Sequence, residues 1–311
     1  MDGYKIVLTR NDVDESFHEI DIVNNYSSES FGYFPRSAIK PFQLVPLVYE
    51  MLNNKIEIDL GEIAIFCASH SGESLHTRKV KATAEKYSLN FEDIFCEKQI
   101  PFHAETYIKL IQNNQNYSKL HNNCSGKHVG MLLLCDLLGL DSKDYQNLEH
   151  PLQKEIDLFY KDLFEIDEIF YGVDGCGLPA PYLDTNTFLS AVKKLNISKT
   201  YRESWMIIFN SFISYPEYTA GTDRVDTVIM KESKEDVLIK AGAEGSMFFS
   251  DLETSTVIKC KDGSKRGIDI ASMYFAKKSG YIETTSYDNF IKTFTHNNQN
   301  TKVADIKIIE K

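Results

Sequence analysis

The chain has 311 residues, of which 42% are hydrophobic and 25% are charged, as in an ordinary globular protein. Its formal net charge of −11 argues against a nucleic-acid partner and against binding to anionic membrane surfaces. No apolar run approaches the roughly 20 residues of a membrane-spanning helix, and the N-terminus does not read as a signal peptide. We therefore expect a soluble, cytoplasmic protein whose six scattered cysteines are free, buried or metal-binding rather than paired.

The predicted elements place strands at both ends of the chain and helices in the middle. The N-terminal part is expected to contain strands at 4–9 and 18–23, a helix after Ser37 that is interrupted at Pro46, and a buried strand at 63–72. Helices follow at 73–89, 125–138 and 150–164, then a strand that breaks into a Gly/Pro-rich loop at 168–183, and further helices to about 214. The C-terminal part is expected to contain a turn with a helix or strand at 220–230, strands within 236–263, a helix at 265–279 and a strand at 303–311. This order predicts one α+β domain over residues 1–311. Its central antiparallel sheet is formed by both termini, and a mostly helical subdomain is inserted at roughly 72–215.

The stretch "FPRSAIKP" places Ser37 three residues before Lys40, at the start of an apolar helical run. This spacing brings an amine within reach of a hydroxyl, and a neutral amine could activate that hydroxyl as a nucleophile. The alternative is a capping serine followed by a solvated lysine, which the motif alone favours. The same spacing recurs at Ser190 and Lys193, so one match in this chain is expected to be chance.

A second group of reactive side chains lies in "CASHSGE", residues 67–73, where the predicted buried strand ends. Ser69, His70 and Ser71 stand there beside a glycine turn, a common position for catalytic side chains. The alternative is a turn in which one of the serines caps the following helix. The motif alone does not separate these two interpretations.

Two cysteines lie on separate polar turns and could share a metal ion. Cys124, in "HNNCSGKHVG", precedes an apolar helix, and a helix N-terminus would lower the pKa of its thiol. Cys176 lies between glycines in "GVDGCGLP". The alternative is that each is a small buried hydrophobic residue, the commonest fate of a free cysteine.

Two further cations lie beside turns. Arg224, in "AGTDRVDT", could clamp a carboxylate with two hydrogen bonds, or form an ion pair with a neighbouring aspartate. Lys240 precedes the flexible "AGAEG" run, where it could enter a cleft or remain solvated on a strand.

These motifs, taken in order from "FPRSAIKP" through "CASHSGE", "NNCSGKHVGML", "GVDGCGLPAPYL" and "AGTDRVDT" to "AGAEG", resemble the Rhizobium etli-type L-asparaginases, the class 3 or asparaginase II family. The resemblance covers about residues 15–250. It implies a fold similar to serine β-lactamases and glutaminases, a homodimer, and hydrolysis of L-asparagine to L-aspartate and ammonia. Several positions depart from the family pattern, such as "SYPEYTAGTDRVDT", and they bear on substrate preference.

The resemblance also implies roles for individual residues. The catalytic serine–lysine pairs would be Ser37 with Lys40 and Ser69 with Lys240, and a zinc ion would be held by Cys124, Lys127 and Cys176. Charge and context add Arg224 for the substrate carboxylate, Asp174 or Glu244 for its ammonium group, and His70 to orient the site.

Three alternatives remain open on the sequence. The first is a glutaminase or another serine–lysine acyl hydrolase of the same fold. The second is a cysteine hydrolase with Cys124 or Cys176 as nucleophile and His121 or His128 as base. The third is a non-catalytic zinc-binding protein.

Overall fold

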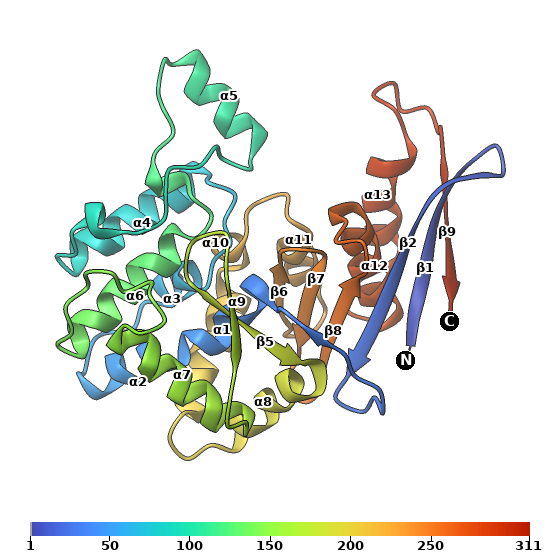
Figure 1. Cartoon of the computed structure of the whole chain (residues 1–311). Coiled ribbons are helices and arrows are strands. Elements are labelled where there is room, and N and C mark those ends of the chain that lie inside the picture. The colour runs from blue at the N-terminus through green and yellow to red at the C-terminus, as the bar shows by residue number, and fades with distance from the viewer. Residues whose placement is uncertain (1) are drawn as a thin grey trace.

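The computed structural model describes residues 2–311, which form two antiparallel sheets surrounded by helices (Figure 1). The strands are β1 (Asp2–Arg10), β2 (Val13–Asn24), β3 (Gly32–Tyr33), β4 (Phe170–Val173), β5 (Pro179–Asp184), β6 (Leu238–Gly242), β7 (Ser246–Ser250), β8 (Ser255–Cys260) and β9 (Asp305–Glu310). The helices are η1 (Arg36–Ile39), α1 (Lys40–Gln43), α2 (Val45–Asn53), α3 (Leu60–Phe66), α4 (Ser74–Lys86), η2 (Phe91–Asp93), α5 (Ala104–Gln112), η3 (Lys119–His121), α6 (Ser125–Leu137), α7 (Pro151–Phe164), α8 (Thr185–Ile197), α9 (Arg202–Ser214), α10 (Pro216–Thr219), α11 (Val225–Glu232), α12 (Lys265–Lys278) and α13 (Thr284–Thr295), where η marks a 3₁₀-helix. The predicted α+β class is confirmed.

The larger sheet joins the two ends of the chain. Its strand order is β6-β7-β8-β2-β1-β9, and neighbouring strands run antiparallel. A two-residue turn links β1 to β2, and its residues Asn11 and Asp12 have left-handed φ angles of 48° and 62°, which suit Asn and Asp. On the other side of β1 lies β9, with Tyr4 opposite Glu310. The N- and C-termini therefore lie side by side, as Figure 1 shows.

The prediction of a buried strand at residues 63–72 is wrong. Residues Leu60–Phe66 form helix α3, and the chain becomes extended only after it. Every residue from Gly61 to Phe66 is buried, so the run has no polar face. A short apolar run that is buried on all sides carries no periodicity by which to distinguish a strand from a helix. The helix begins at Asp59, whose carboxylate accepts hydrogen bonds from the N–H groups of Gly61 and Glu62 at 2.7 and 3.2 Å.

Removal of this cap should weaken the fold. We expect Asp59→Ala to lower the free energy of unfolding by about 0.5–2 kcal/mol, because two N–H groups of α3 lose their acceptor. Burial alone would raise the pKa of Asp59, but the hydrogen bond and charge of Lys79, 2.6 Å away, lower it overall. This stabilisation is therefore present above the unfolded-state pKa of about 3.9 and is lost as the pH falls through the lower folded-state pKa.

Urea unfolding from pH 7 down to pH 3 checks this expectation. The exposed helical Asp136 provides the control, since Asp136→Ala removes a carboxylate without removing a cap. Equal midpoints for wild type and Asp59→Ala at pH 7 would contradict the assigned role of the cap.

Two hydrophobic clusters pack on opposite faces of the larger sheet. Successive strand residues alternate between them: Leu238 and Phe248 join the cluster on the helical side, whereas Ile239 and Phe249 join the cluster that includes α12. The same period of two places Lys240 on the face of Leu238, toward the helical side of the molecule. The fold thus directs a lysine from the sheet toward the helices that begin near Ser37.

Phe42 anchors the short helix that carries Lys40. Its ring stacks on Trp205 with centroids 5.4 Å apart and an interplanar angle of 6°. It also meets Phe188 at 5.0 Å and Phe248 at 5.6 Å. Because these rings come from α9, α8 and β7, three separate elements fix the orientation of α1.

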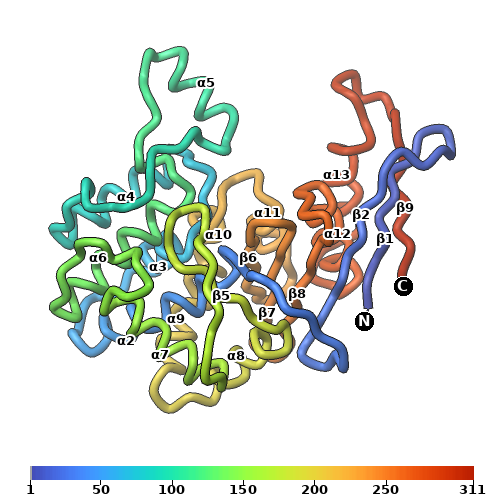
Figure 2. Tube along the Cα trace, viewed as in Figure 1, coloured from blue at the N-terminus to red at the C-terminus, as the bar shows by residue number. Residues whose placement is uncertain are grey.

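Helix α5 stands apart from the body of the molecule, at the end of a long excursion of the chain (Figure 2). None of its residues is buried. Among residues 2–311, no helix combines the length and apolarity required to cross a membrane.

Candidate active site

Ser37 lies in η1, which packs against β6 and β7. The preceding residue, Arg36, has a left-handed φ of 54°, an uncommon conformation for a long side chain and one that recurs at functional sites. Gly242 permits the close approach of η1 to β6, because a Cβ atom there would lie 2.3 Å from the carbonyl oxygen of Pro35. The fold thus holds Ser37 in a strained turn against the strand that carries Lys240.

Lys40 is 1% exposed and its ammonium group contacts three acceptors. Its Nζ donates to Ser69 Oγ at 3.0 Å, to Cys124 Sγ at 3.2 Å and, by a short bond, to the carbonyl oxygen of Ala68. The expected pairing of Lys40 with Ser37 is not the one seen here. The hydrogen bond runs instead to Ser69, which couples the two predicted serine–lysine pairs to each other.

Ser69 follows α3 in an extended segment that is fixed by backbone hydrogen bonds. The N–H of Ser69 donates to the carbonyl of Thr219 at 2.9 Å, and that of Ser71 donates to the carbonyl of Ala220 at 2.7 Å. These two bonds join the "CASHSGE" segment to the turn before α11. Motifs that lie about 150 residues apart in the sequence therefore meet at Ser69.

Lys240 is fully buried on β6, and its Nζ donates to the carbonyl oxygen of Ala241 at 3.0 Å. Burial lowers its pKa to about 7, and the positive charges of Lys40 and Arg224 act in the same direction. The carboxylate of Asp226 opposes them. A lysine with this pKa carries a proton about half of the time at neutral pH, so it can both accept and donate one.

Cys124, Lys127 and Cys176 lie close enough to influence one another. Cys124 is the N-cap residue of α6, Lys127 lies one turn further on, and both are buried with Cys176. A hydrogen bond from Cys124 lowers the pKa of Cys176, and the charge of Lys127 lowers it further. The same hydrogen bond and burial raise the pKa of Cys124. The prediction of a lowered pKa at Cys124 is therefore wrong, because its bond to Cys176 and its burial outweigh the helix N-terminus.

The donor set of these three residues suits a soft divalent metal ion. Two adjacent sulfur atoms and a nearby nitrogen are ligand types that zinc prefers. Burial lowers the pKa of the nearby His128, although its hydrogen bond to Cys176 acts in the opposite direction, and its Nδ1 contacts the Tyr145 hydroxyl at 2.5 Å. Burial lowers the pKa of Lys127, but the charges of Cys176 and Cys124 reverse this and raise it overall. Lys127 must therefore lose a proton before it could bind a metal.

Asp174 and Glu244, the candidate partners of a substrate ammonium group, both contact Arg36. Its Nε and Nη2 atoms each lie 2.7 Å from Oδ1 of Asp174, and its Nη1 lies 3.5 Å from Oε1 of Glu244. Asp174 is largely covered, whereas the side chain of Glu244 is 70% exposed. The residue before Ser37 thus links the turn of Cys176 to the loop after β6.

The other two candidate binding residues differ from each other in what they could offer a ligand. Both ring nitrogens of the buried His70 are occupied, by Ser125 Oγ at 2.9 Å and by the N–H of Gly72 at 3.2 Å. His70 therefore suits a positioning role better than substrate contact. Arg224 has a buried Nε without a partner among residues 2–311, so its guanidinium retains a free donor.

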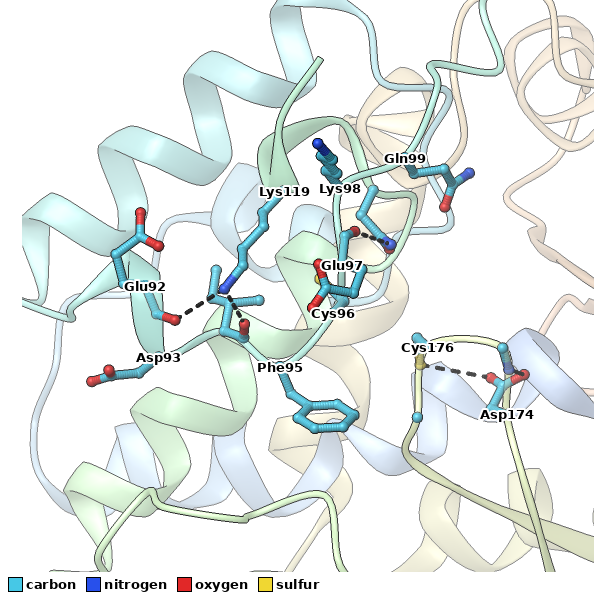
Figure 3. A pocket seen from close by; sticks show the side chains of 14 residues that line it. Glu92, Asp93, Phe95, Cys96, Glu97, Lys98, Gln99, Lys119, Asp174 and Cys176 are labelled. Atoms are coloured by element: carbon cyan, nitrogen blue, oxygen red, sulfur yellow. Dashed lines mark hydrogen bonds between the residues drawn. The ribbon is translucent and has the colours of Figure 1, made fainter. Parts of the chain in front are cut away.

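A cavity of about 690 Å³ opens beside the cysteine turn. Figure 3 shows Asp174 and Cys176 on one wall and Phe95, Cys96 and Glu97 on the facing one. Neither candidate nucleophile lines this cavity, and Ser37 and Ser69 are only 9% and 5% exposed. Of the three candidate metal ligands, Cys176 lines it.

A second group of possible metal ligands lies elsewhere, at His18, Cys260 and Asp262. Arg266 donates to Nε2 of His18 at 3.0 and 3.1 Å, so Nδ1 carries the proton and donates to Asp262 at 2.7 Å. A protonated Nδ1 has no lone pair for a metal ion. This group is therefore a hydrogen-bonded clamp between β2 and the turn after β8.

The second Ser-x-x-Lys match is ordinary helix surface. Ser190 Oγ donates to the carbonyl of Thr187 within α8 at 2.8 Å, and Lys193 is exposed. Two residues that the sequence interpretation did not select as site residues lie at the candidate site as well. Arg36 was detectable as the cation directly before Ser37, and Asp226 lies in the "AGTDRVDT" motif, where it was considered only beside Arg224.

The site thus contains buried serine hydroxyls, buried lysine amines and two buried thiols. The family model described as L-asparaginase II matches residues 6–308, nearly the whole chain. The chain belongs to this family and is an L-asparaginase, an amidohydrolase whose substrate is asparagine. A comparison with curated proteins found no match.

Proposed function

We propose that this chain hydrolyses L-asparagine through an acyl-enzyme of the Rhizobium etli, class 3 type. Ser37 Oγ attacks the side-chain amide carbon of asparagine, and its proton passes through a lysine amine to the leaving nitrogen. Ammonia departs and a β-aspartyl ester remains on Ser37. Water then adds to the ester, and its cleavage releases L-aspartate and returns the proton to Ser37.

The observation that carries this proposal is the buried hydrogen bond between Lys40 and Ser69 at 3.0 Å. Ser37 lies in η1, and Lys40 begins α1 directly after it, three residues further along the chain. We assign the amine of Lys40, which bonds to Ser69, to serve the hydroxyl of Ser37 during attack as well. We assign nucleophilic attack to Ser37, which follows the strained Arg36, and proton relay to Ser69, whose hydroxyl Lys40 engages.

Lys240 supplies a second amine whose proton is exchangeable at neutral pH. We assign it to polarise Ser69 during the relay. Arg224 is assigned to the α-carboxylate of asparagine because its buried Nε is free to donate. Asp174 or Glu244 receives the α-ammonium group, and His70 positions the surrounding backbone.

Zinc is the metal that we propose for the sulfur site, held by Cys124, Lys127 and Cys176. A bound zinc ion would supply a Lewis acid close to the substrate. The protein residues have separate tasks: Cys176 is already favoured as a thiolate, whereas Lys127 must first deprotonate. Zinc affinity should therefore fall as the pH falls.

Metal binding can be tested without any substrate. We expect wild type to bind about one equivalent of zinc tightly and Cys176→Ser to lose this binding, because one of two sulfur ligands is gone. Cys135→Ser provides the control, since Cys135 is buried within α6 and outside the proposed ligand set. Dialysis against zinc followed by elemental analysis measures the stoichiometry, and undiminished binding by Cys176→Ser would contradict the ligand assignment.

We further propose that residues 1–311 act as one catalytic domain with a serine β-lactamase- or glutaminase-like fold, and that the enzyme is a cytoplasmic homodimer. The six-stranded antiparallel sheet with helices on both faces supports the fold proposal. Light scattering of the purified protein tests the dimer, and a monomeric mass at working concentration contradicts it.

Measurements of ammonia release from asparagine and from glutamine, and of ring opening of the β-lactam nitrocefin, test the substrate proposal. We expect asparagine to give the largest kcat/KM. A larger value for glutamine or nitrocefin would move the chain to another serine–lysine acyl hydrolase activity. Activity that is lost on alkylation by iodoacetamide in the presence of zinc would indicate a cysteine nucleophile instead.

A further inference from the structure

Asp226 is a fully buried carboxylate for which the proposed mechanism has no use. It lies in the first turn of α11, and its Oδ1 has no hydrogen-bond partner among the described residues. Such a group is costly to bury, because a carboxylate loses its hydrogen bonds to water and the protein replaces only some of them. Its position next to the candidate site calls for a specific role.

The other oxygen of Asp226 contacts the strand that carries Lys240. Oδ2 accepts a hydrogen bond from the N–H of Ala241 at 3.3 Å. Because β6 is an edge strand of the sheet, this N–H has no neighbouring strand to bond with. Ala241 also accepts the hydrogen bond from Lys240 Nζ through its carbonyl. Both backbone groups of Ala241 are thus held, its N–H by Asp226 and its carbonyl by Lys240.

Asp226 is also the carboxylate that acts on Lys240. The charged or titratable groups that influence Lys240 are Lys40 on α1, Cys67 after α3, Cys124 at α6, and Arg224 and Asp226 at α11. The positive charges of Lys40 and Arg224 disfavour a proton on Lys240. Asp269 on α12 interacts with Arg224 and Asp226, but its own carboxylate is bonded to Lys265.

We propose that Asp226 is a positioning residue for Lys240, fixing the β6 backbone at Ala241 and supplying the negative charge that lets a buried lysine carry a proton among other cations. The proposal deepens the function above, since it rests on the proposed use of Lys240 as a proton-exchanging group. Asp226 itself does not touch substrate. Its test therefore needs a measurement on Lys240 that does not depend on asparagine hydrolysis.

The measurement is NMR of protein labelled with ¹³C at the lysine Cε atoms, with the Lys240 signal identified by its loss in Lys240→Met. In wild type, this signal should titrate with a midpoint near pH 7. In Asp226→Asn, which retains an acceptor for Ala241, the midpoint should move to lower pH. A displacement of one pH unit lowers the protonated fraction at pH 7 about fivefold.

Three comparison variants separate this role from a structural one. Arg224→Met should move the midpoint in the opposite direction, to higher pH, which loosened packing of α11 does not explain. Thr227→Val, a neighbouring buried polar position bonded to Pro216, should leave it unchanged. If Asp226→Asn does not fold, Asp226→Glu retains the charge and should keep the wild-type midpoint.

An unchanged midpoint in folded Asp226→Asn, or a downward displacement in Asp226→Glu, overturns the proposal. So does a wild-type Lys240 that titrates with the solvated lysines near pH 10.4. If the protein hydrolyses asparagine, the limb of its pH–rate profile that reports Lys240 should move with the NMR midpoint. A midpoint that moves in a protein without asparaginase activity would support the Asp226 assignment and reject only the proposed function.

Discussion

Replacement of Ser37 by alanine should lower kcat for asparagine hydrolysis by about 10³-fold or more, because the ester intermediate can no longer form. KM should change much less, since the hydroxyl is small and the proposed substrate contacts lie elsewhere. Ser69→Ala should also lose most activity, through the relay and the lost acceptor for Lys40. A coupled assay of ammonia release measures both variants.

The chain provides a matched control for this experiment. Ser190→Ala removes a hydroxyl at the same Ser-x-x-Lys spacing, where Ser190 bonds only within α8 to Thr187, and it should retain full activity. Mass spectrometry of wild type quenched during turnover should show an adduct on the peptide that contains Ser37. An adduct on Ser69 would exchange the two assigned roles, whereas full rates in both alanine variants would exclude the serine mechanism.

Lys40→Met is expected to have an effect of similar size, a loss of about 10³-fold or more in kcat. Methionine approximates the length of the lysine side chain, so the buried volume is largely kept while the amine is removed. Three acceptors then lose their donor: Ser69 Oγ, Cys124 Sγ and the carbonyl of Ala68. Proton transfer from the attacking serine loses its acceptor at the same time.

The fold should survive this change. The buried carbonyl of Ala68 loses its donor, at a cost of about 1–3 kcal/mol, whereas the cost of burying an amine is removed, so the melting temperature should fall modestly. Lys193→Met on the exposed face of α8 is the matched control and should be fully active. Lys40→Arg separates charge from proton exchange, because arginine keeps a positive charge but does not serve as a base. An active Lys40→Arg enzyme would contradict the role of Lys40 in proton transfer.

Much of the fold was predictable from local patterns. Alternating strands at the two ends of the chain, the capped helix after Cys124 and its end at Gly139 depend on residues within one or two turns of each other. The α3 segment was mistaken for a strand because its side chains are buried all round by elements far away in the sequence. Periodicity reports one solvent-facing side, and α3 has none.

The candidate site also has features that local sequence patterns predicted and features that depend on distant segments. The order of six short motifs was enough to indicate the family, and the family match over residues 6–308 agrees with it. The sequence also located Cys124 and Cys176 as residues that could share a metal. The resemblance paired Ser37 with Lys40 and Ser69 with Lys240. It did not reveal the bond from Lys40 to Ser69, because spacing along the chain reports only neighbours three or four residues apart.

The sequence by itself therefore determined the family, the α+β class and the residue types available for chemistry. The tertiary structure decided that Lys40 bonds to Ser69, 29 residues away, and that the thiols of Cys124 and Cys176 lie beside the charge of Lys127. It also brought Asp226 against β6 beside Lys240. The physical reason is that proton affinity in a protein depends on burial and on charges within a few ångströms, and both are set by packing between distant segments.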